Sequence, residues 1–160
     1  MIVRAAKASD AAGICDVWNP LIQGTATTFT TDLKTAEGIA ADISARAGAF
    51  FVAEEAGELL GLATYFPFRG GPGYARTKEH SINLAPNARG RGVGRALMGA
   101  LEIHARSSGV HSLWAGISGE NLQGVVFHER LGFTHIARLP EVGFKFDRWM
   151  DLVLMQKILT

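Results

Sequence analysis

The segment Glu79–Gly94, with the sequence EHSINLAPNARGRGVG, constrains the fold of this chain more than any other. It predicts a strand, a turn at Pro86, and a loop that opens onto a helix. The loop holds three glycines and three arginines: Gly90, Gly92 and Gly94, and Arg89, Arg91 and Arg95. Glycines let the backbone approach a ligand closely, the start of a helix presents unpaired N–H groups, and arginines add permanent positive charge. The junction therefore predicts a phosphate site.

Two common nucleotide-binding motifs do not fit this loop. A P-loop, GxxxxGK[ST], needs a lysine and a hydroxyl after its last glycine, whereas Arg95 and Ala96 follow Gly94. A Rossmann motif needs GxGxxG and an acidic ribose ligand about 20 residues further on, whereas this loop reads GxGxG and has no such carboxylate. One alternative stays open, which is a tight strand-to-helix connection with a solvated basic rim.

A second motif lies downstream, where Asn121 and His128 precede the sequence LGF. Together with Arg89-x-x-Gly92-x-Gly94, it resembles the two motifs of GNAT-type N-acetyltransferases, and the two occur in the same order. The resemblance implies a GNAT fold, which is a mixed, mostly antiparallel central sheet flanked by helices, in the α/β (α+β) class. It also implies acetyl-CoA as the cosubstrate.

Over nearly the whole chain the sequence is similar to the phosphinothricin acetyltransferase family. Six segments carry the similarity: 24–29, 65–69, 74–81, 88–97, 127–133 and 141–156. The similarity implies a small amino-acid acceptor, such as phosphinothricin, methionine sulfone or methionine sulfoximine. It implies cofactor contacts at Ile82, Asn83, Leu84, Gly90, Arg91, Gly92, Val93, Gly94, Arg95 and Asn121. It implies acceptor contacts at Arg69, Gly70, Gly71, Glu79, His80 and Ser81.

The chemistry of such a transfer suggests roles for residues of the 79–85 strand. Strand alternation places Glu79, Ser81 and Asn83 on one face and His80 on the other. Glu79 at the start of the strand is the candidate general base for the acceptor amine, and a solvated strand-end carboxylate is its alternative. Backbone N–H groups further along could hold the thioester oxygen. Asn83 departs from the family, in which an aromatic residue is usual here, and this affects the expected acceptor range.

Two residues outside this strand are further candidates. His128 stands where many acetyltransferases have a tyrosine that protonates the departing thiolate, and its ordinary pKa permits acid or base duty; a packed histidine is the alternative. Asn121 lies seven residues earlier, on the same helix face. Arg69 could bind a carboxylate or phosphinate through two parallel hydrogen bonds, or be an unpaired loop arginine.

The rest of the chain predicts alternating helices and strands. A first helix is expected after an N-cap supplied by Ser9 with Asp10, and Asn19–Pro20 should end or kink it. A second helix, capped at Thr35, is expected at 35–46, and two more at 91–107 and 121–131. Strands are expected at 2–5, 50–54, 59–66, 79–85, 111–117, 134–139 and 149–158. The loop GFKFDRW between the last two strands could be a lid, a dimer contact or a plain hairpin loop.

Composition excludes several classes of protein. With 160 residues and 48% hydrophobic content, a single domain over residues 1–160 is expected. Net charge is only +1, and the local basic residues alternate with glycines without an aromatic platform, so nucleic-acid binding is not expected. No apolar stretch approaches a membrane span, and Cys15 is the only cysteine, so we expect a cytoplasmic protein that binds no membrane. The five histidines lack zinc-site spacing, so no metal is expected.

The sequence therefore favours an N-acetyltransferase that acts directly on the α-amine of a small amino acid and forms a homodimer. Two alternatives stay open. One is an acetyltransferase for another amine, such as a polyamine or a peptide N-terminus, and the other is a coenzyme A sensor without turnover.

Overall fold

The computed structural model describes all residues 1–160. Seven strands form one sheet: β1 (Ile2–Ala5), β2 (Phe50–Glu55), β3 (Glu58–Pro67), β4 (Thr77–Leu84), β5 (Ser112–Ser118), β6 (Thr134–Lys145) and β7 (Arg148–Ile158). Four α-helices accompany them: α1 (Ala11–Gly24), α2 (Ala36–Ala45), α3 (Val93–Ser107) and α4 (Leu122–Arg130). Short 3-10 turns lie at Ala8–Asp10, Pro72–Tyr74 and Pro86–Ala88. None of the helices combines the length and apolar character needed to cross a membrane.

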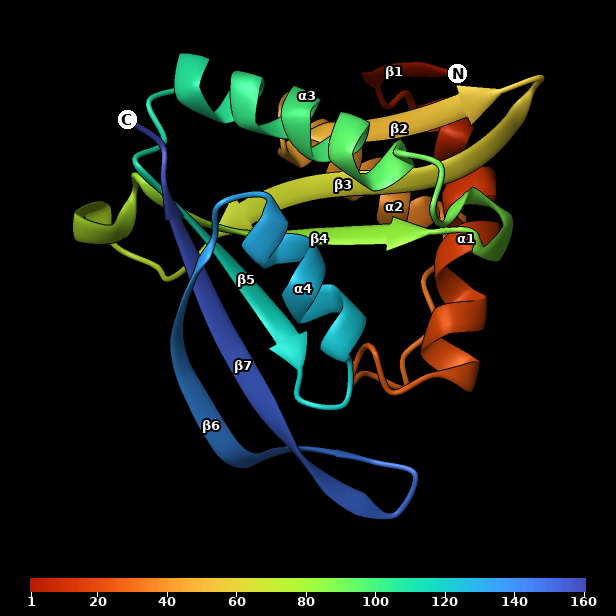
Figure 1. Ribbon diagram of the computed structural model, residues 1–160. Helices are drawn as coiled ribbons and strands as arrows, with labels where there is room; N and C mark the ends of the chain where they lie inside the picture. The colour runs from red at the N-terminus through yellow and green to blue at the C-terminus, as the bar shows by residue number, and fades with distance from the viewer.

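The strands lie in the order β1-β2-β3-β4-β5-β7-β6. All neighbours are antiparallel except β4 and β5, which run parallel and are joined by α3 as the crossover. Pairing between β4 and β5 covers only Thr77–His80 and Ser112–Ala115. Beyond these residues the two strands diverge (Figure 1). Residues of both strands line the cavity described below.

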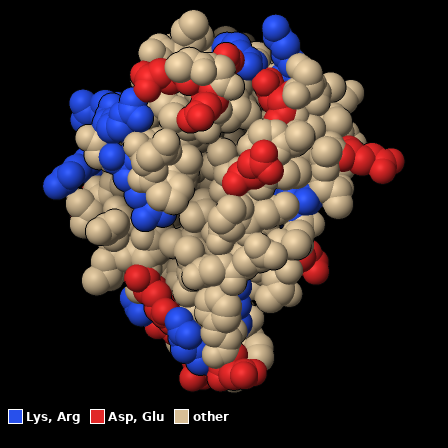
Figure 2. Space-filling view, turned by 90° about the vertical axis from the view of Figure 1, so that its right-hand side faces the viewer, with Lys and Arg blue, Asp and Glu red and all other residues tan.

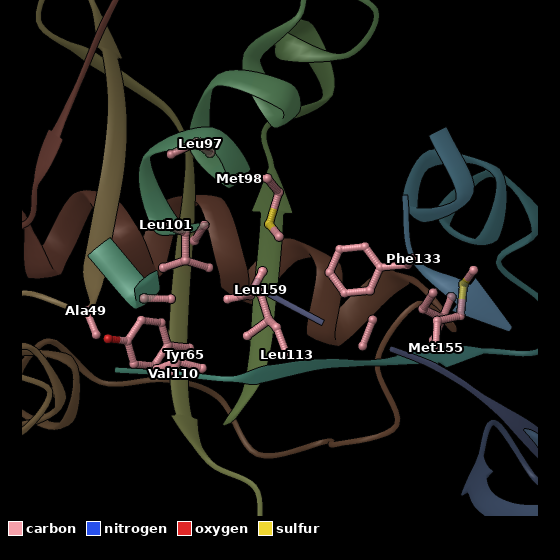
Figure 3. Packing of buried hydrophobic residues seen from close by; sticks show 14 of the residues in the cluster. Ala49, Tyr65, Leu97, Met98, Leu101, Val110, Leu113, Phe133, Met155 and Leu159 are labelled. Carbon is pink, nitrogen blue, oxygen red and sulfur yellow. The ribbon is translucent and has the colours of Figure 1, made fainter. Parts of the chain in front are cut away.

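Helices cover both faces of the sheet, with α3 and α4 on the near face in Figure 1 and α1 and α2 on the far face. On the α3 side, Leu97, Met98 and Leu101 of the helix pack with Leu113 and Met155 of the sheet in a cluster of 19 buried residues (Figure 3). On the α1 side, a second cluster of nine buried residues lies between the two helices and strands β2 and β3. The part of the sheet formed by β2 and β3 is therefore covered by helices on both faces, as the mixed α/β prediction requires.

Helix α1 differs from the prediction at both of its ends. It runs through Pro20 to Gly24, so it does not end at Asn19–Pro20, which was one of the two outcomes expected there. Leu21 and Ile22 are both buried, and Ile22 packs on the sheet in the cluster of nine. Burial of two such side chains offsets the backbone hydrogen bond that proline removes. At the start, the Asp10 carboxylate accepts hydrogen bonds from Arg4 and from the Lys7 N–H rather than capping the helix. The predicted Thr35 cap of α2 is confirmed, since its hydroxyl accepts from the Gly38 N–H.

The last two strands form a longer hairpin than predicted. We expected a strand at 134–139 and a loop up to 148, but β6 continues to Lys145 through two irregularities in its pairing with β7. The turn consists of Phe146 and Asp147, both with positive φ of 53° and 57°. Two residues with positive φ are the geometry of a tight two-residue hairpin. The GFKFDRW segment is thus a hairpin, which projects beyond the rest of the sheet in Figure 1.

Candidate active site

A cavity of about 960 Å³ opens where β4 and β5 diverge. Its walls come from α1 and the loop that follows it, from β4, from the start of α3, from β5 and from α4. Eleven of the residues expected at the site line it: His80, Ser81, Ile82, Asn83, Leu84, Gly90, Gly92, Val93, Gly94, Arg95 and Asn121. His128 lines it as well, whereas Glu79, Arg69, Gly70, Gly71 and Arg91 do not.

Strand β4 presents free backbone groups to this cavity. The Ala85 N–H donates to the Leu60 carbonyl of β3 at 2.9 Å, and backbone groups alternate in direction along a strand. The N–H groups of Ile82 and Leu84 therefore point away from β3, toward the side from which β5 has diverged. They are the two donors that an extended ligand lying along β4 would meet.

The glycine loop supplies an open cradle at the start of α3. Gly90 and Gly92 have positive φ of 72° and 80°, and a methyl group added to either would meet no atom within 4 Å. The backbone here faces open space at a helix N-terminus, which is an arrangement that binds anions. At Gly94 an added methyl group would lie 3.0 Å from the Phe127 ring, so this glycine lets α3 pack closely on α4. These features fit the phosphate groups of a coenzyme A.

Positive charge surrounds the cradle. Arg89 and Arg95 line the cavity, and Arg130 approaches it from α4. Arg91 instead forms an ion pair with Glu55 at the end of β2, and this contact lowers the pKa of that carboxyl group. Figure 2 views the end of the molecule at which α3 begins, and Lys and Arg side chains gather at its upper left edge.

Asn121 is the residue that starts α4. Its side-chain oxygen accepts a hydrogen bond from the Gly124 N–H at 3.0 Å, which caps the helix. The residue therefore precedes the first helical turn, and its amide nitrogen is the group left to address a ligand. Asn121 and His128 do line the same cavity, as their spacing predicts.

His128 is held in place by two hydrogen bonds. Its Nδ1 lies 2.7 Å from the Gly124 carbonyl, and its Nε2 lies 2.9 Å from Nε2 of His80. A carbonyl only accepts, so Nδ1 of His128 carries a hydrogen, and in the neutral ring Nε2 then accepts from His80. This leaves Nδ1 of His80 as an acceptor, and it is the one buried side-chain polar atom without a partner. His80 thus faces His128 rather than the Glu79 side of the strand.

Burial favours the neutral form of both rings of this pair. Burial, and to a lesser degree the neighbouring His128 ring, lowers the pKa of His80 to about 3, while the Trp114 backbone opposes the shift. Burial also lowers the pKa of His128, opposed by the Gly124 carbonyl. In the neutral pair the only hydrogen on His128 is donated to Gly124. The arrangement therefore leaves His128 no free N–H to give to a thiolate unless its bond to His80 breaks.

Glu79 lies on the opposite face of β4, half-buried between Phe66 of β3 and Trp114 of β5. It forms no ion pair, and burial raises the pKa of its carboxyl group. A methyl group added to Gly116, which lines the cavity, would lie 4.0 Å from Oε1 of Glu79. The carboxylate is thus immediately behind the cavity wall, and a half-buried carboxylate with a raised pKa is a better proton acceptor than an exposed one.

The Arg69–Gly71 segment is exposed and lies outside the cavity lining. The Arg69 guanidinium lies 6.0 Å from the centre of the Phe68 ring, and Phe68 stacks on Trp114 with a centroid distance of 5.4 Å. Trp114 pairs in register with Glu79. An aromatic stack therefore connects Arg69 to the Glu79 face of the sheet.

Sequence reasoning missed the wall on the α1 side. Five of its residues line the cavity: Trp18, Leu21, Thr27, Thr28 and Phe29. The segment 24–29 carries part of the family resemblance, but the resemblance implies no role for its residues. Its threonines and phenylalanine in a loop without helix or strand periodicity were the available signal. No group of three or more His, Cys, Asp or Glu side chains forms a potential metal site.

The fold and the site together define an acetyltransferase. The model of the acetyltransferase (GNAT) family matches residues 18–133, and the chain belongs to this family. It is an N-acetyltransferase that uses acetyl-CoA, and the GNAT fold and the function class predicted from the two motifs are confirmed.

Relatives extend the similarity over nearly the whole chain. An L-amino acid N-acyltransferase, MnaT, from Escherichia coli K12 is 36% identical over 98% of this chain and 92% of its own length. An L-methionine sulfoximine/L-methionine sulfone acetyltransferase from Salmonella typhimurium is 35% identical over 98% of this chain and 93% of its own. The crystal structure of a phosphinothricin acetyltransferase from Sinorhizobium meliloti in complex with acetyl-CoA superposes with a TM-score of 0.92 at 29% identity, covering 98% of this chain and 87% of that one.

Proposed function

We propose that this enzyme acetylates the α-amine of a small amino acid whose side chain ends in a sulfone, sulfoximine or phosphinate group. The observation that carries the proposal is the half-buried Glu79 carboxylate, unpaired and adjacent to the cavity at Gly116. The relatives named for methionine sulfone and phosphinothricin support the substrate class. Acetyl-CoA supplies the acetyl group as a thioester.

The cofactor is assigned to the α3 end of the cavity. Backbone N–H groups of Gly90, Gly92 and Gly94 would bind its phosphates, helped by Arg89 and Arg95. The N–H groups of Ile82 and Leu84 would donate to the extended arm and to the thioester carbonyl oxygen, on which negative charge develops. Asn121 would donate its free amide nitrogen from the other side.

The acceptor is assigned to the Glu79 face of β4. There Glu79 accepts the proton that the attacking amine must lose, directly or through one water. Ser81 is the next residue on this face and lines the cavity, so its hydroxyl can orient the acceptor. Arg69 would bind the acceptor carboxylate or its tetrahedral side-chain group at the far end of the Phe68–Trp114 stack. His128 protonates the departing sulfur only if the bond to His80 opens.

The test is release of coenzyme A thiol from acetyl-CoA with separate acceptors. The panel comprises methionine sulfone, methionine sulfoximine, phosphinothricin, ordinary amino acids and spermidine. Turnover confined to the first three is the expected result. Turnover confined to spermidine or to ordinary amino acids would overturn the acceptor assignment, and acetyl-CoA binding without thiol release from any amine would indicate a sensor.

We propose that the enzyme is a homodimer formed through the β6–β7 hairpin. Several large apolar side chains on this hairpin are exposed: Ile136, Val142, Phe144, Phe146 and Trp149. Such a cluster on one projecting element is typical of an interaction surface. Light scattering at micromolar concentration should give twice the chain mass for the wild type and a smaller mass for Trp149→Ser. A monomeric wild type would refute the proposal.

We also assign residues 1–160 to one catalytic domain acting in the cytoplasm. The single-domain assignment is supported by the single sheet, which contacts both buried clusters. The cytoplasmic location is supported by Cys15, a free thiol of the kind found in a reducing compartment. Cell fractionation tests the location.

A further inference from the structure

Lys145, next to the turn of the β6–β7 hairpin, is a buried cation that the proposed chemistry does not use. Only 3% of the residue is exposed. Its Nζ donates to three backbone carbonyls, those of Ile22 at 2.6 Å, Thr25 at 2.8 Å and Thr28 at 2.9 Å. An ammonium has three hydrogens to donate, so all of its hydrogen bonds are made to carbonyls of the segment 22–28.

No carboxylate balances this charge, because Lys145 takes part in no ion pair with Asp or Glu. Its counter-charge is the partial negative end of α1, since Ile22 lies in the last turn of that helix. The Phe146 ring adds a further contact, with Nζ 5.1 Å from its centre. A buried cation is tolerated only when it is so completely bonded, which means that Lys145 and the three carbonyls hold one another in place.

The β6–β7 hairpin also contacts the loop of residues 25–29 at a second point. The Phe29 ring packs directly on Gly143, where an added methyl group would lie 2.4 to 2.7 Å from three ring atoms. Residue 143 must therefore lack a side chain for Phe29 to lie there. The loop of residues 25–29 is thus attached to β6 twice, by Lys145 at Thr25 and Thr28 and by Gly143 at Phe29.

This loop forms part of the cavity wall on the acceptor side. Thr27, Thr28 and Phe29 line the cavity. The loop continues from α1, which packs on Leu62 in the cluster of nine buried residues. Leu62 pairs in register with Asn83, so α1 covers the face of β4 that carries Glu79, Ser81 and Asn83. The glycine cradle for acetyl-CoA is formed by other elements.

We infer that Lys145 is a positioning residue that fixes the 25–29 loop as the acceptor-side wall, so that binding of the amino-acid acceptor depends on it and binding of acetyl-CoA does not. This inference rests on the proposed function, because it assigns the Glu79 side of the cavity to the acceptor.

Two variants and one control test the inference. Lys145→Met removes the ammonium while keeping an unbranched apolar stem, and Gly143→Ala displaces Phe29 without touching the lysine. Lys157→Met is the matched control, because Lys157 also lies in the hairpin and donates to Glu102 and the Leu131 carbonyl, away from the loop. Each protein is assayed for the KM of methionine sulfone, for the Kd of acetyl-CoA by calorimetry, and for amide hydrogen exchange of residues 25–29.

The expected result is that the two variants impair binding of the acceptor but not binding of acetyl-CoA. In Lys145→Met and Gly143→Ala the acceptor KM should rise by about tenfold or more, the acetyl-CoA Kd should stay within about twofold, and the loop amides should exchange faster. Lys157→Met should change none of the three. An unchanged acceptor KM, or an equal loss for both ligands, would overturn the inference, and so would unchanged loop exchange. If the wild type acetylates no amino acid, the proposed function fails, and the exchange data still decide whether Lys145 orders the loop.

If Lys145→Met does not fold, the same three measurements on Gly143→Ala still test the inference, because that substitution displaces Phe29 and leaves Lys145 in place.

Discussion

Nε2 of His80 and Nε2 of His128 lie 2.9 Å apart in the interior, and the two rings join the central strand β4 to helix α4. The hydrogen bond requires that at least one ring be neutral at its Nε2 atom. Phe133 packs on both rings, with centroid distances of 5.4 and 5.2 Å, and both histidines are buried although they line the cavity. The pair is therefore a buried, neutral link across the wall of the cavity.

Acid should destabilise the protein through this pair. The folded pKa of His80 is about 3, below the unfolded value near 6.5, so the unfolded chain binds more protons between these values. The stability contribution is complete above about pH 6.5 and is lost as the pH falls toward the folded pKa. Urea unfolding should show a loss of about 2 kcal/mol from His80 between roughly pH 7.5 and pH 5.

A comparison of two variants assigns this effect. The exposed His111 serves as the control, so His111→Gln should keep the acid sensitivity, whereas His80→Phe should reduce it. Equal unfolding free energies of the wild type at the two pH values would show that the pair is not held neutral.

Replacement of Glu79 should remove most of the chemical step. Glu79→Gln keeps the size of the side chain but cannot accept a proton, so kcat should fall by about 100-fold or more with the Kd of acetyl-CoA unchanged. Because burial raises the pKa of Glu79 above its ordinary value, wild-type activity should decline with acid at a higher pH than an exposed glutamate would give. Glu58→Gln at the start of β3 is the control. Full turnover of Glu79→Gln across pH would exclude the base role.

Alanine substitutions at two glycines of α3 should have different effects on the protein. At Gly99 an added methyl group meets nothing within 4 Å, so Gly99→Ala should stabilise the protein by about 0.5–1 kcal/mol through helix propensity. At Gly94 the methyl group would meet the Phe127 ring at 3.0 Å, so Gly94→Ala should push α4 from α3 and weaken acetyl-CoA binding. Thermal melts and calorimetry measure both effects. Equal acetyl-CoA affinity in the two variants would contradict the role of Gly94 in closing the cradle.

Arg69→Ala should weaken binding of the acceptor but not binding of acetyl-CoA. Loss of a charge-assisted contact should raise the KM of methionine sulfone by about tenfold, with little change for acetyl-CoA, because Arg69 is remote from the glycine cradle. Arg76, exposed in the same connection between β3 and β4, supplies the control variant Arg76→Ala. An unaltered acceptor KM in Arg69→Ala would remove Arg69 from the acceptor site.

Local sequence signals predicted those parts of the fold whose causes are local. The glycine loop, the Thr35 cap and the alternation of Glu79 and His80 follow from backbone conformation and strand geometry. The end of α1 could not be predicted in this way, because Pro20 signals a break and only the burial of Leu21 and Ile22 in the folded chain overrides it. The length of the β6–β7 hairpin was not predicted because β6 continues past Leu139 through an irregularity in its pairing with β7, which interrupts the regular alternation of a strand.

By itself, the sequence determined the family, the cofactor and the position of the cradle, because these depend on residues that are close together in the chain. Only the tertiary structure decided that His80 binds His128, 48 positions away, and that Lys145 binds carbonyls more than 115 positions earlier. Both contacts are buried polar interactions between distant segments. The free energy of a buried polar group depends on which partner the folded chain brings to it, and no local pattern specifies that partner.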